Sequence, residues 1–208
     1  MHLYTYDPAP NPRRLGLFLA LKEIDIDTTQ IDLMQLEQLG EQYRAICPAG
    51  TVPTLRLDDG TLITEVIAIC DYLESLHPQK PLMGTTPLAR AQVLGWDHHI
   101  YINAFSAVAE VLRNGNPNFA DRALPGPVKT PQIPALVDRG RERLQRGWQT
   151  YDEALNGRDF LVGDTLTLAD IDLLVCSEFA GWVKESIPED CESLLAWRAR
   201  VRQVLDAG

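Results

Sequence analysis

The residues best suited to a binding chemistry lie between Pro48 and Leu76. Pro53 precedes a short β-branched run and must stand at the first position or the edge of a strand, because proline has no N–H to donate. An X-Pro bond is also where cis peptides occur, and a cis bond at a tight turn would expose the backbone groups of Val52. A helix is predicted to begin near Glu65, with unpaired N–H groups that attract an anion. The two features together predict a receptor for a small anionic peptide.

Prolines and glycines divide the first 78 residues into short segments that alternate between strand and helix character. The predicted segments are a strand over Leu3–Tyr6, a helix from Pro12 to about Lys22 capped by Asn11, a strand within Asp25–Leu33, a helix near Leu36–Ile46, a hairpin of Thr54–Leu57 and Thr61–Ile63, and a helix from Glu65 to Leu76. The order β-α-β-α-β-β-α predicts an α/β domain of the thioredoxin-like kind, with a mixed four-stranded sheet.

The rest of the chain shows helical periodicity and no further strand pattern. Four long helices are predicted, over Leu88–Arg113, Pro134–Leu155, Thr167–Lys184 and Glu192–Leu205. The predicted domains are therefore an α/β domain over residues 1–78, a linker over 79–86 and an all-helical domain over 87–208. A proline-rich loop over residues 114–134 joins the first two helices of the second domain, and Thr167 and Asp170 have the spacing of a capping box.

Composition excludes several classes of function. A net charge of −10 argues against nucleic acid or an anionic membrane as a partner, because both require clustered Lys and Arg. The four cysteines form no C-x-x-C pair and have no metal-like spacing with the histidines, so we expect buried free thiols and no metal. Without a basic leader or an apolar run of about 20 residues, the chain is expected in the reducing cytoplasm.

In order and spacing, these motifs resemble those of the cytosolic glutathione transferases. The matching stretches are Met1–Tyr6, Pro10–Arg14, Gly50–Pro53, Asp59-Gly60, Glu65 and Thr167–Asp170, spread over nearly the whole chain. The resemblance implies an enzyme of detoxification that takes glutathione as co-substrate and a small hydrophobic electrophile as acceptor. It also implies a homodimer.

The resemblance assigns the glutathione-binding residues. The loop Thr51, Val52 and Pro53 would pair the backbone of Val52 with the cysteinyl part of the ligand, as a short added strand. Glu65 would pair with the γ-glutamyl amino group, and the N–H of Val66 would hold the carboxylate. Family members usually carry serine where this chain has Val66. Losing a hydrogen bond to a charged group costs about 1.5–3 kcal/mol, so binding is predicted to be roughly ten- to a hundredfold weaker.

The group that activates the glutathione thiol is harder to assign, because Ala9 stands where the family usually has a serine or threonine hydroxyl. Asn11 could donate its NH2 to the thiolate while also capping a helix, since a cap uses only the carbonyl oxygen. Tyr6 could donate its phenol, although an aromatic residue at the end of a strand is more often packed core. Cys47 could form mixed disulfides, although a structural thiol is the commoner role.

Three functions stay open on these residues: transfer to an electrophile, glutathione-dependent disulfide reduction, or a non-catalytic binding or scaffold role. The acceptor pocket is expected between the domains, along the first helix of the second domain. Its candidate residues are Trp96, His99, Tyr101, Asn103, Phe105 and Arg113, with none preferred over the others.

Overall fold

The computed structural model describes residues 1–206, and its Cα packing divides the chain into two compact units. The sheet unit contains Met1–Lys80 together with Leu124–Thr130. The helical unit contains Pro81–Ala123 and the described chain from Pro131 onward. No helix among the described residues is both long and apolar enough to cross a membrane. The domain boundaries 1–78, 79–86 and 87–208 stay a prediction.

The sheet unit has the order of elements that the sequence predicts. Its elements are β1 (His2–Thr5), α1 (Pro10–Lys22), β2 (Asp27–Gln30), η1 (Glu37–Leu39), α2 (Glu41–Ile46), β3 (Thr54–Arg56), β4 (Leu62–Thr64) and α3 (Val66–Leu76). The strands lie in the order β2-β1-β3-β4, with β1 parallel to β2 and antiparallel to β3, and β3 antiparallel to β4. The predicted thioredoxin-like fold with a mixed sheet is therefore confirmed.

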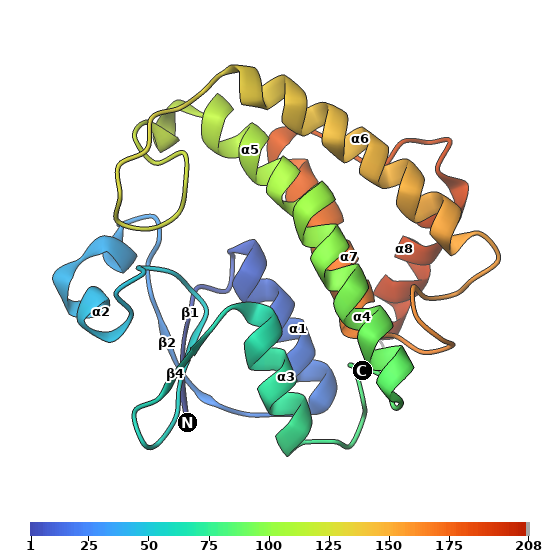
Figure 1. The fold of residues 1–208 in the computed structure, drawn as a ribbon, viewed down its shortest axis with the longest axis horizontal. Helices are drawn as coiled ribbons and strands as arrows, with labels where there is room; N and C mark the ends of the chain where they lie inside the picture. Colours follow the sequence, from blue (N-terminus) through green and yellow to red (C-terminus); the bar gives the residue numbers. More distant parts are fainter. Residues whose placement is uncertain (207–208) are drawn as a thin grey trace. The chain divides into compact units, whose positions relative to one another are not determined.

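Side chains that alternate along β1 give the sheet two covered faces. Tyr4 packs edge-on against Tyr43 of α2, with ring centroids 5.9 Å apart, and both belong to a buried cluster with Ile31 and Cys47. The opposite face is left to α1 and α3, which lie next to each other (Figure 1). The buried register pair Leu3–Leu55 belongs to that face.

The start of α1 differs from the prediction. Ala9, not Asn11, is the N-cap, and the helix begins at Pro10 rather than Pro12. Ala9 precedes a proline and is extended, with φ −79° and ψ 146°, so the chain can turn into the helix at Pro10, whose fixed φ suits the first helical position. The helix predicted over Leu36–Ile46 is likewise two pieces, because Gly40 between them is extended.

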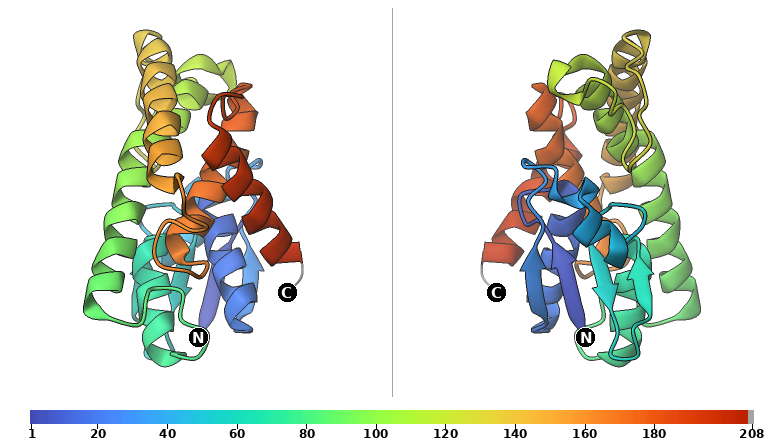
Figure 2. Two further views of the ribbon diagram at one scale, coloured as in Figure 1. Left: turned by 90° about the vertical axis from the view of Figure 1, so that its right-hand side faces the viewer. Right: turned by 90° about the vertical axis from the view of Figure 1, so that its left-hand side faces the viewer.

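The longest feature of the helical unit is a nearly continuous run of helix. Its elements are α4 (Pro87–Ile100), the π-helical segment η2 (Tyr101–Phe105), α5 (Ser106–Gly115), η3 (Pro117–Phe119), α6 (Ala135–Leu155), α7 (Leu168–Ala180), η4 (Gly181–Val183) and α8 (Glu192–Asp206). In Figures 1 and 2, α4, η2 and α5 continue one another, and α6 runs back along them. Every residue of α7 except Glu178 is buried, which makes this helix the core of the unit.

The four predicted helical stretches are present, with two differences. The π-helical segment η2 interrupts the first, and the third ends as an α-helix at Ala180 and continues as the 3-10 segment η4. The proline-rich connection after α5 is tied at its ends. The Gln132 side chain donates to the carbonyl oxygens of Arg113 and Asn116, each at 2.7 Å, and the backbone N–H of Ile133 donates to Asn114 Oδ1 at 2.9 Å. The connection is thus fixed to the end of α5 rather than free.

Gly140→Ala is expected to lower the free energy of unfolding by about 2 kcal/mol, because α6 approaches α5 too closely for a methyl group. A Cβ at Gly140 would lie 2.7 Å from the carbonyl oxygen of Ala107 and 2.8 Å from Val111 Cγ2. Gly95→Ala in α4 is the control, since nothing lies within 4 Å of its Cβ position. That change should raise stability by roughly 0.5–1 kcal/mol through helix propensity. Urea denaturation of both variants checks the pair, and equal shifts would contradict it.

Candidate functional site

Strand register brings the predicted binding residues to one end of the sheet. Tyr4, Thr54 and Thr64 form one row across β1, β3 and β4. Beyond this row β1 and β4 end and β3 begins, so the residues after β1, the loop before β3 and the start of α3 all lie at the same end. The N-terminus of α1 follows β1 and lies there too. Four predicted parts of one site therefore meet by topology.

The loop before β3 is anchored on one side and open on the other. Tyr43 donates its hydroxyl hydrogen to the carbonyl oxygen of Thr51 at 2.6 Å, and the Thr54 hydroxyl lies 3.2 Å from the same oxygen. The Val52–Pro53 bond is cis. Within residues 1–206, neither the N–H nor the C=O of Val52 has a hydrogen-bonding partner. The loop thus presents a fixed donor and acceptor to whatever lies beside it.

Cys47 lies beneath this loop. Its residue is 1% exposed, and its sulfur is 4.0 Å from Thr51 Oγ1. Burial raises the pKa of the Cys47 thiol, but hydrogen bonds with Thr54 and Thr51 outweigh burial and leave the pKa below its usual value. A sulfur so enclosed supports the loop and is not open to a ligand. All four cysteines are buried and free, and no three metal-binding side chains gather among the described residues.

Glu65 is held in an unusual backbone conformation at the N-cap of α3. Its φ of 67° and ψ of 124° cost about 1–3 kcal/mol for a residue other than glycine. Its carboxylate is exposed and has no partner within residues 1–206. The N–H groups of the first turn, beginning at Val66, are also unpaired there, whereas the Val66 side chain is buried, at 4% exposed. Strain of this kind is typical of functional sites.

Asn11 stands at the second position of α1, and its side chain has a defined orientation. Arg14 Nη1 donates to Asn11 Oδ1 at 3.1 Å. Because a guanidinium can only donate, the amide atom facing Arg14 must be the oxygen, and the NH2 group is directed to the other side. Arg14 is buried, at 4% exposed, so its charge is fixed beside this amide. The i, i+3 spacing of the two residues is a sequence signal that predicts the contact.

Tyr6, the other predicted catalytic residue, follows β1 directly. It is half-buried, its carbonyl oxygen accepts from the N–H of Ala9 at 2.8 Å, and its hydroxyl has no partner within residues 1–206. Tyr6 and Asn11 therefore flank the turn that leads into α1.

The residues named for the acceptor pocket separate onto different faces of the helical unit. The rings of Trp96 and His99 pack against Tyr151 of α6, with centroids 6.1 and 5.6 Å away. Tyr101 instead stacks on Phe105, 5.9 Å away and nearly parallel. Asn103 donates to the His99 carbonyl oxygen at 3.1 Å, and Arg113 lies over the ring of Phe119. These residues do not form one wall.

The stack of Tyr101 on Phe105 extends into a row of four rings. Phe105 lies 5.2 Å from Phe179 of α7, and Phe179 lies 5.4 Å from Trp182 of η4. Both ends of the row reach the surface, since Tyr101 is 46% and Trp182 is 55% exposed. Sequence reasoning missed Phe179 and Trp182, because no local pattern links two helices more than 70 residues apart.

A thioredoxin-like unit with an open loop and an unpaired helix start, followed by a helical unit, defines a class of two-domain proteins. Family comparison identifies the class. Residues 9–76 match the glutathione S-transferase N-terminal domain, and residues 102–203 match the glutathione S-transferase C-terminal domain. Glutathione S-transferase 2 of Saccharomyces cerevisiae is 31% identical over 205 residues, covering 98% of this chain and 86% of the yeast protein. The chain belongs to the glutathione S-transferase family and is a glutathione transferase by class.

Two further comparisons were found, one with a structure of this family and one with a relative named as an isomerase. The crystal structure of a glutathione S-transferase domain-containing protein from Marinobacter aquaeolei VT8 superposes with a TM-score of 0.87 at 32% identity, covering 97% of both chains. A maleylacetoacetate isomerase of Pseudomonas aeruginosa is 36% identical over 121 residues, which cover 54% of this chain and 56% of that enzyme.

Proposed function

We propose that this transferase binds glutathione beside Val52, activates its thiol with the Asn11 amide and presents the thiolate to a small hydrophobic electrophile. The observation that carries the proposal is the gathering of unpaired groups at one end of the sheet. They are the backbone N–H and C=O of Val52, the Glu65 carboxylate and the first N–H groups of α3. An extended zwitterionic peptide has the complementary groups.

The backbone of Val52 would pair with the cysteinyl residue of glutathione, in the way a strand adds to a sheet edge. The γ-glutamyl carboxylate would then meet the N–H of Val66 and the positive end of the α3 dipole. Its ammonium group would meet Glu65, whose strained backbone fixes the direction of the carboxylate. Thr51 and Pro53 hold the loop and make no charged contact of their own.

The Asn11 amide would activate the thiol. A donor to the sulfur stabilises the thiolate and lowers the pKa of the bound thiol, and the N-terminal dipole of α1 acts in the same direction. The thiol proton leaves to solvent. The thiolate then forms a carbon–sulfur bond with the electrophile, and the leaving group departs with the electron pair of the bond that breaks. Tyr6 is the second candidate for this donor.

The electrophile would be a small hydrophobic compound that carries an aryl or alkyl group. Family membership further favours a homodimer and a cytoplasmic location. Disulfide reduction, a non-catalytic binding role and an isomerase activity like that named for the Pseudomonas relative are the other outcomes that the assays below distinguish.

Glu65→Gln is expected to weaken glutathione binding about ten- to a hundredfold, because one charged hydrogen bond is lost while the side-chain shape is kept. Isothermal titration calorimetry measures the change. Glu41→Gln, at the exposed start of α2, is the matched control and should bind as the wild type does. Failure of the wild type to bind glutathione would overturn the proposed site.

Asn11→Ala should reduce turnover of a chloronitrobenzene by roughly tenfold at neutral pH with little change in glutathione affinity, because it removes the donor to the thiolate. It also removes the oxygen that accepts from Arg14, so circular dichroism must show that the variant keeps its fold. The loss should shrink as pH rises, since the thiol then ionises without help. Binding without any turnover in the wild type would instead support a scaffold protein. Turnover of a glutathione mixed disulfide, or of maleylacetoacetate, in place of the chloronitrobenzene would assign the reductase or the isomerase.

Val66→Thr is expected to tighten glutathione binding about tenfold, because it adds a hydroxyl beside the γ-glutamyl carboxylate while keeping the branched shape that fills the core. Val66→Ser adds the same hydroxyl but gives up buried packing, so it should bind more tightly and be less stable. Val66→Ala, which lacks the hydroxyl, is the control. Equal affinity of the threonine and alanine variants would contradict a carboxylate at this helix start.

A further inference from the structure

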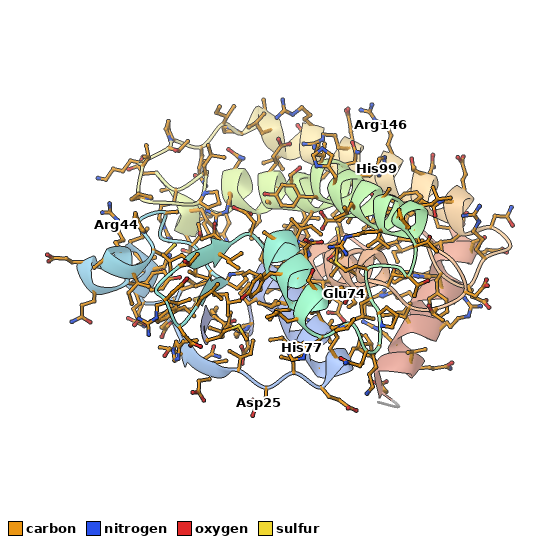
Figure 3. All side chains as sticks on the ribbon, turned by 60° about the horizontal axis from the view of Figure 1, so that its bottom comes forward. Asp25, Arg44, Glu74, His77, His99 and Arg146 are labelled. Atoms are coloured by element: carbon orange, nitrogen blue, oxygen red, sulfur yellow. The ribbon has the colours of Figure 1, made fainter. Side chains whose placement is uncertain are left out.

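A second polar pocket lies in the helical unit, between α4 with η2 and α6. Its volume is about 130 Å³, close to the size of a single small ion with its nearest water. The lining residues are His99, Asn103, Arg143, Arg146, Gly147 and Thr150. Figure 3 shows His99 and Arg146 next to each other at this pocket, one from each side. None of these residues takes part in the proposed glutathione site.

The pocket is lined by donors. Its six lining residues carry two guanidinium groups, an imidazole, an amide and a hydroxyl, and include no carboxylate. The Thr150 hydroxyl already donates to the carbonyl oxygen of Arg146 at 3.0 Å, which leaves the other groups as donors. A guanidinium fork is the side chain that best matches a phosphate or carboxylate.

The nearby ion pairs leave positive charge uncompensated. Glu110 of α5 is shared by two guanidinium groups, lying 2.7 Å from Arg139 and 3.0 Å from Arg143. Arg143 is held further by the carbonyl oxygen of Ile102 and, at 3.1 Å, by the hydroxyl of Ser106, so its direction is fixed. Arg146 is 75% exposed and only loosely paired, 3.5 Å from an equally exposed glutamate on the next turn of α6. The Arg146 guanidinium can therefore rotate to contact a bound anion.

Local backbone structure makes room for the pocket. η2 is a π-helical segment, a rare form that widens the helix and is frequent at functional sites. Gly147 lines the pocket from α6, and a Cβ there would make only ordinary contacts, 3.6 Å from the Asn103 carbonyl oxygen and 3.4 Å from the Tyr151 ring. The site is therefore built by one deviation from ordinary helix geometry, the π-helical segment η2.

Two buried polar atoms beside the pocket lack partners within the described chain. They are His99 Nδ1 and the hydroxyl of Tyr151, a residue that is 0% exposed. The two rings pack edge-on, 5.6 Å apart. Burial also lowers the pKa of His99, so the imidazole is mainly neutral and offers a hydrogen bond at neutral pH. Leaving such groups unpaired costs free energy, and of the two residues only His99 lines the pocket.

We propose that this pocket binds a phosphate-sized oxyanion, with Arg146 and Arg143 supplying the charge and Asn103 and His99 supplying hydrogen bonds. The pocket is large enough for one such group and too small for a nucleotide. The anion is therefore either free inorganic phosphate or the terminal phosphate of a small phosphomonoester whose remainder lies outside. Because no residue is shared with the glutathione site, this proposal stands or falls separately from the proposed function.

The test is an NMR titration of the full chain with inorganic phosphate at constant ionic strength, following the His99 ring and the Asn103 side-chain amide. Saturable shifts at both groups are expected in the millimolar range, together with about tenfold weaker binding by Arg146→Gln. Arg202→Gln on α8 is the matched control, because Arg202 is 49% exposed and also lies 3.5 Å from a glutamate. It should titrate like the wild type.

A parallel titration with glycerol phosphate separates the two sources. Equal binding of both ligands supports a terminal phosphate group, and binding of inorganic phosphate alone supports the free ion. The proposal is overturned if neither ligand gives saturable shifts. It is also overturned if Arg146→Gln and Arg202→Gln change the affinity equally, since this would mean general charge screening.

Discussion

Replacing Asp170 with alanine is expected to lower the free energy of unfolding by about 4 kcal/mol, because four buried donors would lose their acceptor. The residue is 0% exposed. Its Oδ1 accepts from the N–H of Leu161 at 3.0 Å and from Trp197 Nε1 at 2.9 Å, and its Oδ2 accepts from the N–H and hydroxyl of Thr167 at 3.0 and 2.9 Å. One carboxylate thus joins the start of α7, the loop before it and α8, and completes the predicted capping box.

The variant Asp170→Asn separates the contribution of the hydrogen bonds at Oδ1 from that of the hydrogen bonds at Oδ2. An asparagine can keep the oxygen that faces Leu161 and Trp197, but its NH2 would meet the N–H of Thr167, donor against donor. We therefore expect a loss of about 2 kcal/mol, half that of the alanine variant. Urea unfolding followed by tryptophan fluorescence and circular dichroism measures both, and equal losses would show that the lost contacts with Thr167 dominate.

The pH dependence of the same carboxyl has a defined sign. Burial raises the pKa of Asp170, and the hydrogen bonds from Leu161, Trp197 and Thr167 only partly oppose this. The folded state therefore holds the proton more tightly than the unfolded state, whose carboxyl titrates near pH 3.9. The part of the stability that comes from this tighter proton binding is complete below that pH and is lost as pH rises through the folded pKa, whereas the hydrogen bonds accepted by the carboxylate remain. The asparagine variant should lack this component.

Lys22→Met should lower the free energy of unfolding by about 3–5 kcal/mol, because it removes the Lys22 cation from the buried Glu74 carboxylate. The side chains of Lys22 and Glu74 are 0% and 7% exposed, and their charged atoms are 2.6 Å apart. Lys22 Nζ also donates to the carbonyl oxygens of Gln79 and Lys80, at 3.2 and 3.1 Å. All three ammonium hydrogens thus have acceptors, and they tie α1 to α3 and to the segment after it.

Two further variants test the cause of that loss. The double variant Lys22→Met with Glu74→Met should recover most of the stability, since apolar replacement of a whole buried ion pair is often neutral. Lys80→Met removes an exposed ion pair with Glu23 and should change little. Thermal and urea denaturation compare the series. A double variant as unstable as the single one would assign the effect to the two carbonyl oxygens instead.

The elements of the sheet unit were predictable because short segments between prolines and glycines leave few alternatives. The errors arose where two local preferences compete. Asn11 is a good cap, but Pro10 fits the first helical position, and the constraint it places on Ala9 decided the start of α1. The π-helical segment after Ile100 has no proline or glycine to announce it, and the Lys22–Glu74 pair joins residues 52 apart.

The same contrast holds for the candidate site: its residue types could be predicted from the sequence, but their arrangement could not. The loop at Val52 and the helix start at Glu65 are visible as residue types, so their chemistry could be predicted. Their meeting at one end of the sheet depends on strand register, and the positive φ of Glu65 depends on the turn that β4 makes into α3. Neither can be derived from composition or spacing alone.

Residues 124–130 return to the sheet unit after the helical unit has begun. Gly126, with φ 99°, brings this segment so close that a Cβ would lie 3.4 Å from the carbonyl oxygen of Ala49, just ahead of the loop at Val52. The chain therefore passes between the units three times. A chimera spliced at residue 80 would contain the loop at Val52 but not residues 124–130. Grafting the sheet unit onto another protein therefore requires both residues 1–80 and residues 124–130.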